Sequence, residues 1–345
     1  MIQTSEWVSL GHPDKVADYI SSYLLDRFLE YDRNVRFAVE VQIKDEFVSL
    51  AGEVTSTVAF PDEQIAAFVR EAVLNVGYTR SYRDHWGAEN TICGEDLEVV
   101  QHISQQSPDI ALGVDRDGWG DQGIFWGMAV DNPLTDDMPP DWAMARAIGF
   151  HLFGHPFCGL DIKTQVTYAD GTIRRVIVAA PARSERDQAE VEKSVRSIVS
   201  TGEVIVNGTG RYVVHGPVGD CGTTGRKLAV DFYGGNCVIG GGSPWTKDGT
   251  KADVALNLYA RHRARKMMAE GHYALVRCAI SCCIGRPEIE LAFFNSRGET
   301  IAESRERKSP RQIVDFLRLR EPGFANMCAN GLFSRLPDPE TAVEP

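Results

Sequence analysis

The sequence alternates between helical and strand periodicities along its length, and this alternation limits most strongly the folds it can adopt. Apolar residues recur at helical spacing over residues 14–31, 61–76, 185–200, 252–270 and 310–319. Strand patterns cover residues 37–57, 164–180, 204–215, 275–284 and 288–294, and glycine-rich loops are predicted over 104–127 and 216–249. A strand pair followed by a helix occurs about three times. The chain is therefore predicted to be an α/β protein built of packed α+β layers, with a weak internal repeat.

Charge and cysteine content exclude several classes of protein. The chain has 345 residues, with 36 Lys and Arg against 48 Asp and Glu, a formal net charge of -12. This balance argues against a nucleic-acid coat or a polybasic membrane binder. Eight cysteines without C-x-x-C spacing indicate reduced thiols, and neither a signal peptide nor a membrane-spanning run is visible. We therefore expect a cytoplasmic protein that binds neither nucleic acid nor membrane.

Residues 205–270 form a basic island within this acidic chain. They contain nine Lys and Arg but five Asp and Glu, a local net charge of +4. Some of these cations lie in or beside glycine-rich turns, namely Arg226, Lys227, Lys247 and Lys251. Others are interpreted as a solvated helix face: Arg261, Arg263, Arg265 and Lys266. Cations beside glycine turns and a helix start predict a small polyanion such as a polyphosphate as the ligand.

Three short motifs suggest familiar sites but do not complete them. Residues 118–123 fit G-x-G-x-x-G, yet they follow a polar loop rather than a strand, which argues against a dinucleotide-binding fold. Residues 219–227 resemble a P-loop, but Arg226 interrupts its ending. His151 and His155 are four residues apart without the Glu of a zinc helix, so we predict a packing or surface role for them.

The segment from His12 to Lys15 has more chemical content. It lies at a predicted helix start and offers an imidazole, a carboxylate and an ammonium group within four residues. A His-Pro helix cap alone would be unremarkable. With Asp14 as a Mg²⁺ ligand, the segment indicates a second site for phosphate and metal.

Longer motifs occur in order along the chain. They are GHPDK (11–15), QSPDI with GVDR (106–116), GDQG (120–123), DIKTQVTY (161–168), GPVGDCGTTGRK (216–227), DFYGG (231–235) and GGG followed by KD and a spaced Lys and Asp (240–253). Through these motifs the chain resembles the S-adenosylmethionine synthetases, also called methionine adenosyltransferases. The resemblance implies three similar α/β subdomains with pseudo-threefold symmetry. We expect these over 1–100, 101–217 and 218–345, with a mobile gating loop at about 106–120.

The resemblance also implies a reaction. The sulfur of L-methionine attacks C5′ of ATP and expels tripolyphosphate, which is then hydrolysed to pyrophosphate and phosphate. Two Mg²⁺ and one K⁺ would assist, in a homodimer with active sites at its interface or in a dimer of dimers. A thioether is a neutral nucleophile, so the first step needs no general base, and the difficulty lies in the leaving group.

Individual residues take their expected roles from the same resemblance. The catalytic set would be His12, Lys163, Arg226, Lys247 and Asp121. Further contacts to ATP and its phosphates would come from Lys15, Asp161, Arg211, Tyr212, Asp220, Lys227 and Ser243. Methionine would contact Glu53, Gln106, Asp220 and Lys251. Asp14 and Asp253 would hold Mg²⁺, and Glu40 would hold K⁺.

Some positions depart from the pattern that the resemblance implies. The segment 117–119 is shorter than usual, Tyr212 stands in place of Phe, and Val254 in place of Arg. Residues 244–246, Pro-Trp-Thr, replace a smaller and more flexible run. An active synthetase is the first hypothesis. The alternative is a non-catalytic nucleotide-binding homologue that acts as a regulatory subunit.

Overall fold

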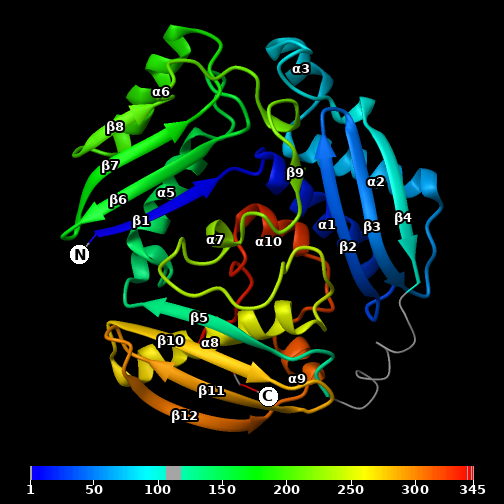
Figure 1. Ribbon diagram of the computed structural model, residues 1–345, viewed down its shortest axis with the longest axis vertical. Helices are drawn as coiled ribbons and strands as arrows, with labels where there is room; N and C mark the ends of the chain where they lie inside the picture. Colours follow the sequence, from blue (N-terminus) through cyan, green and yellow to red (C-terminus); the bar gives the residue numbers. More distant parts are fainter. Residues whose placement is uncertain (1, 106–117, 340, 343, 345) are drawn as a thin grey trace.

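Three four-stranded β-sheets stand around the centre of the molecule, with the short helices α7 (Leu228–Asp231) and α10 (Phe324–Asn330) between them (Figure 1). The computed structural model describes residues 2–105, 118–339, 341, 342 and 344. Within these residues, no helix is long and apolar enough to cross a membrane. The prediction of a mixed α/β fold is confirmed.

The first sheet joins the N-terminal strand to the middle of the chain. Its order is β1 (Ile2–Val8), β6 (Lys163–Ala169), β7 (Thr172–Ala179) and β8 (Glu203–Val206). The helix α5 (Pro140–Leu152) packs on β1 and β6, and α6 (Glu185–Ile198) packs on β8. Asp170 and Gly171 turn the β6–β7 hairpin with φ of 52° and 81°, as the Asp-Gly pair predicts.

The second sheet brings a glycine-rich turn against a helix start. Its order is β4 (Glu98–Ser104), β3 (Phe47–Thr55), β2 (Arg36–Lys44) and β9 (Gly222–Thr223). The helix α1 (Pro13–Leu29) packs on β2 and β9, and it also contacts the helices α2 (Asp62–Val76) and α10. The short helix α3 (Arg80–Trp86) follows α2 along the chain. A Cβ on Gly222 would lie 2.1 Å from the Pro13 carbonyl oxygen, so only glycine allows this approach.

The third sheet is built around the longest helix. Its order is β5 (Gly123–Val130), β10 (Leu275–Cys282), β11 (Glu288–Phe294) and β12 (Thr300–Arg307). The helix α8 (Ala252–Gly271) packs on β5 and β10, and α9 (Pro310–Phe316) packs on α8. Ser309 and Gln312 form a capping box at the start of α9. Three short 3₁₀ turns complete the structure: η1 (Gly94–Asp96), η2 (Pro133–Thr135) and η3 (Gly216–Val218).

The sheets repeat one pattern, with an exchange of edge strands. In the first sheet, β1, β6 and β7 pair antiparallel, and β8 then pairs parallel to β7. In the second sheet, β9, β2 and β3 pair antiparallel, and β4 then pairs parallel to β3. In both sheets a helix precedes the parallel strand. The third is antiparallel throughout, because a tight turn joins β11 to β12. If the chain is divided at residues 100 and 217, each subdomain lends one edge strand (β1, β9 or β5) to the sheet of another, although the division at residue 100 falls inside β4. The linear division itself stays a prediction.

Four local predictions were wrong, the first being the loop over 216–249, which contains β9 and α7. Residues 204–215 form no hairpin, because Asn207 turns the chain with φ of 47° and its buried amide bonds the backbone of Ala180. The predicted loop 104–127 overlaps β5, which begins at Gly123. Arg261 is not on a solvated face: it is fully buried and donates to the carbonyl oxygens of residues 128, 136 and 137.

Candidate active site

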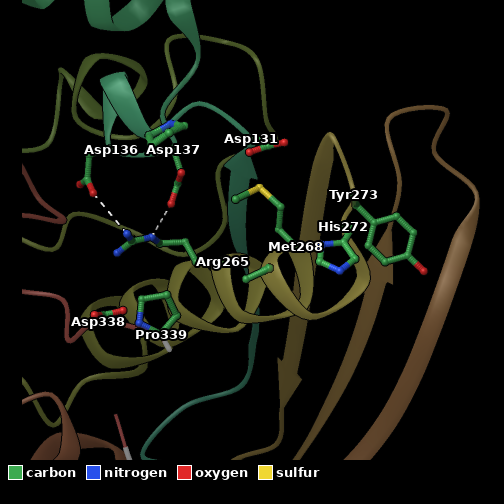
Figure 2. A pocket seen from close by; sticks show the side chains of 11 residues that line it. Asp131, Asp136, Asp137, Arg265, Met268, His272, Tyr273, Asp338 and Pro339 are labelled. Carbon is green, nitrogen blue, oxygen red and sulfur yellow. Dashed lines mark hydrogen bonds and ion pairs between the residues drawn. The ribbon is translucent and has the colours of Figure 1, made fainter. Parts of the chain in front are cut away.

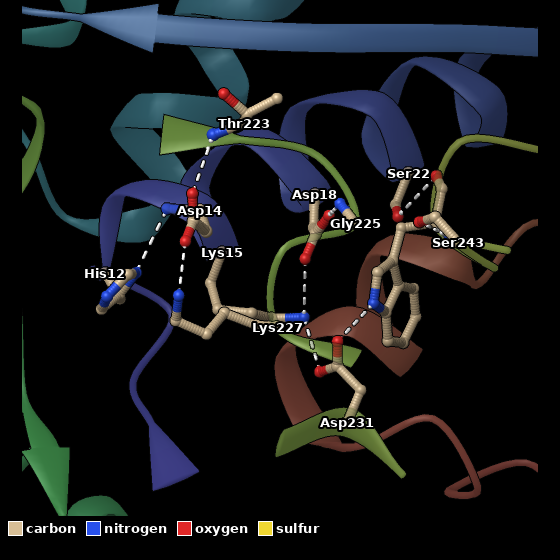
Figure 3. A network of polar contacts seen from close by, with 11 residues as sticks. His12, Asp14, Lys15, Asp18, Ser22, Thr223, Gly225, Lys227, Asp231 and Ser243 are labelled. Carbon is tan, nitrogen blue, oxygen red and sulfur yellow. Dashed lines mark hydrogen bonds and ion pairs between the residues drawn. The ribbon is translucent and has the colours of Figure 1, made fainter. Parts of the chain in front are cut away.

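The N-terminus of α1 and the turn after β9 form the most densely charged part of the site (Figure 3). Asp14 is 1% exposed, and its Oδ1 accepts from the backbone N–H of Thr223 at 2.9 Å. Its Oδ2 lies 2.5 Å from Lys227 Nζ, and its Oδ1 lies 3.5 Å from Arg226 Nε. One predicted metal ligand and two predicted phosphate ligands therefore meet here.

His12 is the N-cap residue of α1 and holds a defined tautomer. Its Nδ1 accepts from the Asp14 N–H at 3.2 Å, so the neutral ring carries its proton on Nε2. Burial lowers the pKa of His12 to about 3, and the charge of Lys227 lowers it further than Asp14 raises it. The ring is therefore neutral at physiological pH and can donate one hydrogen bond from Nε2.

A second charged cluster lies at the start of α8. Lys247 Nζ pairs with Asp253 Oδ2 at 2.6 Å, and Asp253 Oδ1 accepts from the Gly242 N–H at 2.7 Å. Lys251 is the N-cap residue of α8 and makes no side-chain capping bond. Gly225, with φ of 74°, would place a Cβ 3.0 Å from the Cβ of Ser243, so the two clusters are in contact through their glycine turns.

A third cluster surrounds Asp161. Its Oδ2 accepts from Tyr212 Oη at 2.7 Å and from the Gly216 N–H at 2.9 Å. Burial raises the pKa of Asp161 to about 6, although both hydrogen bonds lower it. The charge of Asp220 also raises this pKa, and the charge of Lys227 lowers it. Electrostatic contact with Lys227 links this cluster to the first one.

The remaining predicted residues lie on the strands and turns beside these clusters. Lys163 pairs with Glu6 across β1 and β6 at 2.9 Å, and its charge also lowers the pKa of His12. Glu40 accepts a hydrogen bond from the Thr224 hydroxyl group. Glu53 is paired in register with Ala38, which also bridges to Lys247.

Three exposed residues and one undescribed residue complete the predicted set. Asp121 and Asp220 each accept a bond from the next backbone N–H at 2.8 Å, and Arg211 is exposed. Gln106 and most of the predicted gating loop lie outside the described residues.

Lys15 does not face an open surface. Its Nζ contacts Asp231 at 2.7 Å and Asp18 at 3.2 Å, and the side chain is 4% exposed. Burial raises the pKa of Asp18 to about 7, although Lys15 lowers it. Sequence reasoning missed both carboxylates. The i,i+3 spacing of Lys15 and Asp18 could have indicated one of them, whereas Asp231 is distant in sequence.

A pocket of about 490 Å³ lies at the opposite end of α8 (Figure 2). There Arg265 pairs with Asp137 at 2.9 Å and with Asp136 at 3.3 Å, and Tyr273 and His272 line the wall. None of the described residues predicted to bind substrate or metal lines this pocket. Since α8 is 20 residues long, the two ends are about 30 Å apart.

Comparison with known proteins shows the family to which the chain belongs. The family models "S-adenosylmethionine synthetase, N-terminal domain" and "C-terminal domain" match residues 1–108 and 214–342. S-adenosylmethionine synthase 2 of Rhodospirillum rubrum is 36% identical over 97% of this chain and 92% of its own length. The chain belongs to the S-adenosylmethionine synthetase family. The S-adenosylmethionine synthase of Mesoplasma florum is 33% identical over 96% of this chain and 94% of its own length.

The solved structures include a close match to the fold of this synthetase family. An unusual S-adenosylmethionine synthetase from Campylobacter jejuni superposes with a TM-score of 0.85. The two chains are 28% identical, and the match covers 96% of this chain and 94% of that one. Enzymes of this family generally depend on metal ions, and the described residues contain no group of three or more His, Cys, Asp or Glu that could hold one.

Proposed function

We propose that the chain makes S-adenosylmethionine by holding the triphosphate of ATP between the starts of α1 and α8. The chain is a methionine adenosyltransferase, and its substrates are ATP and L-methionine. The observation that carries the proposal is the contact of two glycine turns. One turn carries Arg226 and Lys227 and the other leads to Lys247, and the charge of Lys227 acts on His12. Cations fixed in advance around a leaving triphosphate are what this reaction requires.

His12 would act on the leaving oxygen as a neutral donor. Its Nδ1 is occupied by the Asp14 N–H, so Nε2–H is free to donate to the oxygen that joins C5′ to the triphosphate. This bond strengthens as negative charge develops on that oxygen, which makes it selective for the transition state. Asp121 and Asp220 would favour the positive charge on the methionine amine and the new sulfonium.

The carboxylates of Asp14 and Asp253 fit the proposed pair of Mg²⁺ ions. Each has one oxygen fixed by a backbone N–H and the other on a lysine ammonium group. Mg²⁺ commonly takes one or two protein carboxylates and completes its shell with water and phosphate oxygens, so no larger cluster is needed. Bound Mg²⁺ would neutralise phosphate charge and leave Lys227 and Lys247 for the remaining phosphate oxygens. Glu40 would hold the single K⁺.

The third sheet carries a face suited to a second copy of this chain. On β10, Cys278 and Ile280 are buried toward α8, so Ala279 and Ser281 face the other way. A groove of about 630 Å³ lies on that outer face, with Ile124 57% exposed beside it and Trp126 stacked on Phe294. We propose a homodimer through this face, with a dimer of dimers as the larger form.

Sedimentation of the wild type and of Trp126→Glu tests the homodimer. We expect a wild-type dimer, and we expect the variant to be monomeric and inactive if the active sites lie at the interface. An active monomeric variant would contradict interface sites, and a monomeric wild type would contradict the dimer.

Mass spectrometry tests the function directly. Purified chain is incubated with ATP, L-methionine, Mg²⁺ and K⁺, and S-adenosylmethionine and phosphate are followed together. Equal amounts of both products are expected. Phosphate without S-adenosylmethionine would contradict the proposed methionine side. Bound ATP with neither product would support the regulatory-subunit alternative, which the named synthases among its relatives do not favour.

A further inference from the structure

A buried polar network that the proposed mechanism does not use lies against the phosphate-binding turns (Figure 3). The buried network consists of Lys15, Asp18, Asp231 and Trp245, which are at most 9% exposed. Lys15 Nζ lies 2.7 Å from Asp231 Oδ1 and 4.5 Å from the centre of the Trp245 ring. The Trp245 indole N–H donates to Asp231 Oδ2 at 2.7 Å. Lys15 is thus held by an ion pair with Asp231 and by a cation–π contact with Trp245. The same Asp231 carboxylate also holds the Trp245 ring through its indole N–H.

The buried network joins the start of α1 to two segments that lie more than 200 residues later in the sequence. Lys15 and Asp18 belong to α1, Asp231 ends α7, and Trp245 belongs to the loop before α8. Asp18 Oδ1 also accepts from the Gly225 N–H at 2.9 Å, at the left-handed residue of the phosphate-binding turn. The ion pairs and side-chain hydrogen bonds described above therefore link α1 to α7 and to the two glycine-rich loops, and Lys15 also contacts Cys328 of α10.

Both loops carry the cations of the proposed site close to these contacts. Arg226 and Lys227 directly follow Gly225, and Lys247 lies two residues after Trp245. A displacement of the network would therefore move both groups of cations relative to each other. In proteins, a buried ion pair can often be replaced by apolar residues without loss of stability. Stability alone therefore does not explain why the network contains charged residues.

We propose that the buried network is a positioning device that sets the spacing between the turn 225–227 and the loop 243–247. The inference rests on the proposed function, because it takes the cations of these segments as ligands of the triphosphate. Trp245 is its distinctive member. Its indole N–H fixes the side chain of Asp231, and its ring covers the ammonium group of Lys15.

Trp245→Phe and Lys15→Met test the proposal, separately and combined. Phe keeps an aromatic ring but loses the N–H donor, and Met keeps the length of the lysine stem but loses its charge. The matched control is Tyr259→Phe, which removes a buried hydroxyl group that accepts a hydrogen bond from Arg263. Both residues lie on α8, outside the two loops. Thermal unfolding monitors the fold, steady-state assays give kcat and each KM, and calorimetry gives the affinity for tripolyphosphate.

We expect Trp245→Phe to lower kcat by about 10- to 100-fold, because small displacements of charged groups have effects of that size. Its affinity for tripolyphosphate should fall about tenfold, while the KM for methionine changes less than about twofold. The double variant should lose much less than the product of the two single losses, because both break the same network. Tyr259→Phe should change only thermal stability.

Three results would overturn the inference. They are folded variants with unchanged tripolyphosphate affinity, multiplicative losses in the double variant, and an equal loss of kcat in Tyr259→Phe. A wild-type chain that forms no S-adenosylmethionine would refute the proposed function instead. The tripolyphosphate titration would then still decide on the network, since it needs no turnover, and a wild type that does not bind tripolyphosphate would refute both.

Discussion

Replacement of Lys247 by Ala removes a leaving-group cation without removing core packing. The Lys247 side chain is 25% exposed and its partner Asp253 is 18% exposed, so their ion pair at 2.6 Å is partly solvated. Such a pair contributes no more than about 1 kcal/mol to stability. In a chain of 345 residues, this corresponds to a fall in Tm of about 1–2 °C. The folded variant should therefore be recovered in good yield.

The catalytic loss should be much larger than the loss of stability. A single preorganised donor to a developing oxyanion contributes about 10²- to 10³-fold to kcat. Lys247 carries a full charge and would contact the leaving triphosphate, so we expect a loss at the upper end of that range. Since the charge on the triphosphate grows as the C5′–O bond breaks, kcat should fall more than the KM for ATP rises.

The assay measures S-adenosylmethionine formation at saturating ATP and methionine, with Tm as the measure of folding. Lys266→Ala is the matched control, because Lys266 is a lysine of α8 that also pairs with a carboxylate, that of Glu344, at 3.4 Å. The control should keep wild-type turnover within about twofold. If Lys247→Ala keeps near-normal turnover while folded, our assignment of the phosphate site is wrong.

Three further predictions concern other parts of the site. Asp121→Asn should slow S-adenosylmethionine formation more than tripolyphosphate hydrolysis; equal losses in the two assays would contradict a role beside the sulfonium. Tyr212→Phe should keep kcat within about threefold, because the ring remains. It should lower the free energy of unfolding by about 1–2 kcal/mol, since the lost hydroxyl group donates to the Asp161 carboxylate at 2.7 Å. An unchanged Tm would refute that bond. His12 has a folded pKa of about 3, below its unfolded value, so its neutral form contributes stability that is lost as pH falls from about 6.5 toward 3. Relative to His12→Asn, wild type should therefore lose about 2 kcal/mol between pH 7.5 and pH 5; a pH-independent difference in denaturant unfolding would show that the ring is not held neutral.

Local sequence signals predicted several elements to within a few residues. The helix α1 starts at Pro13 behind the His12 cap, and α2 ends at Gly77, which has φ of 115°. Both signals act over one helical turn, so they can be read without knowing the fold. The same holds for the turn at Asp170, where the backbone conformation depends on two residues.

Elements without such signals were missed. The strand β1 begins at an exposed Ile2 and gains its hydrogen bonds from β6, more than 150 residues later. The helix α5 is largely apolar and has no side-chain cap, so neither its period nor its start was visible. Their formation depends on partners from other parts of the chain.

Charged residues show the same limit within the site. The sequence alone indicated that Arg226, Lys227 and Lys247 serve a polyanion, because each lies beside glycines that leave backbone amides accessible. It predicted a phosphate contact for Lys15 and a solvated helix face for Arg261, but both side chains are buried. Burial depends on which carboxylates and carbonyl oxygens a distant segment supplies.

The sequence by itself therefore determined the capped helices such as α1 and α2, the Asp-Gly turn of the β6–β7 hairpin and the cation-bearing turns, since caps, periods and glycine conformations are local properties. Only the tertiary structure decided which edge strand joins which sheet and how the turns of residues 225 and 243 come together. It also decided that Lys15 faces Asp231 rather than solvent. These outcomes depend on contacts between segments that are separate in sequence, by 216 residues for Lys15 and Asp231, and their gain appears only once the chain has packed.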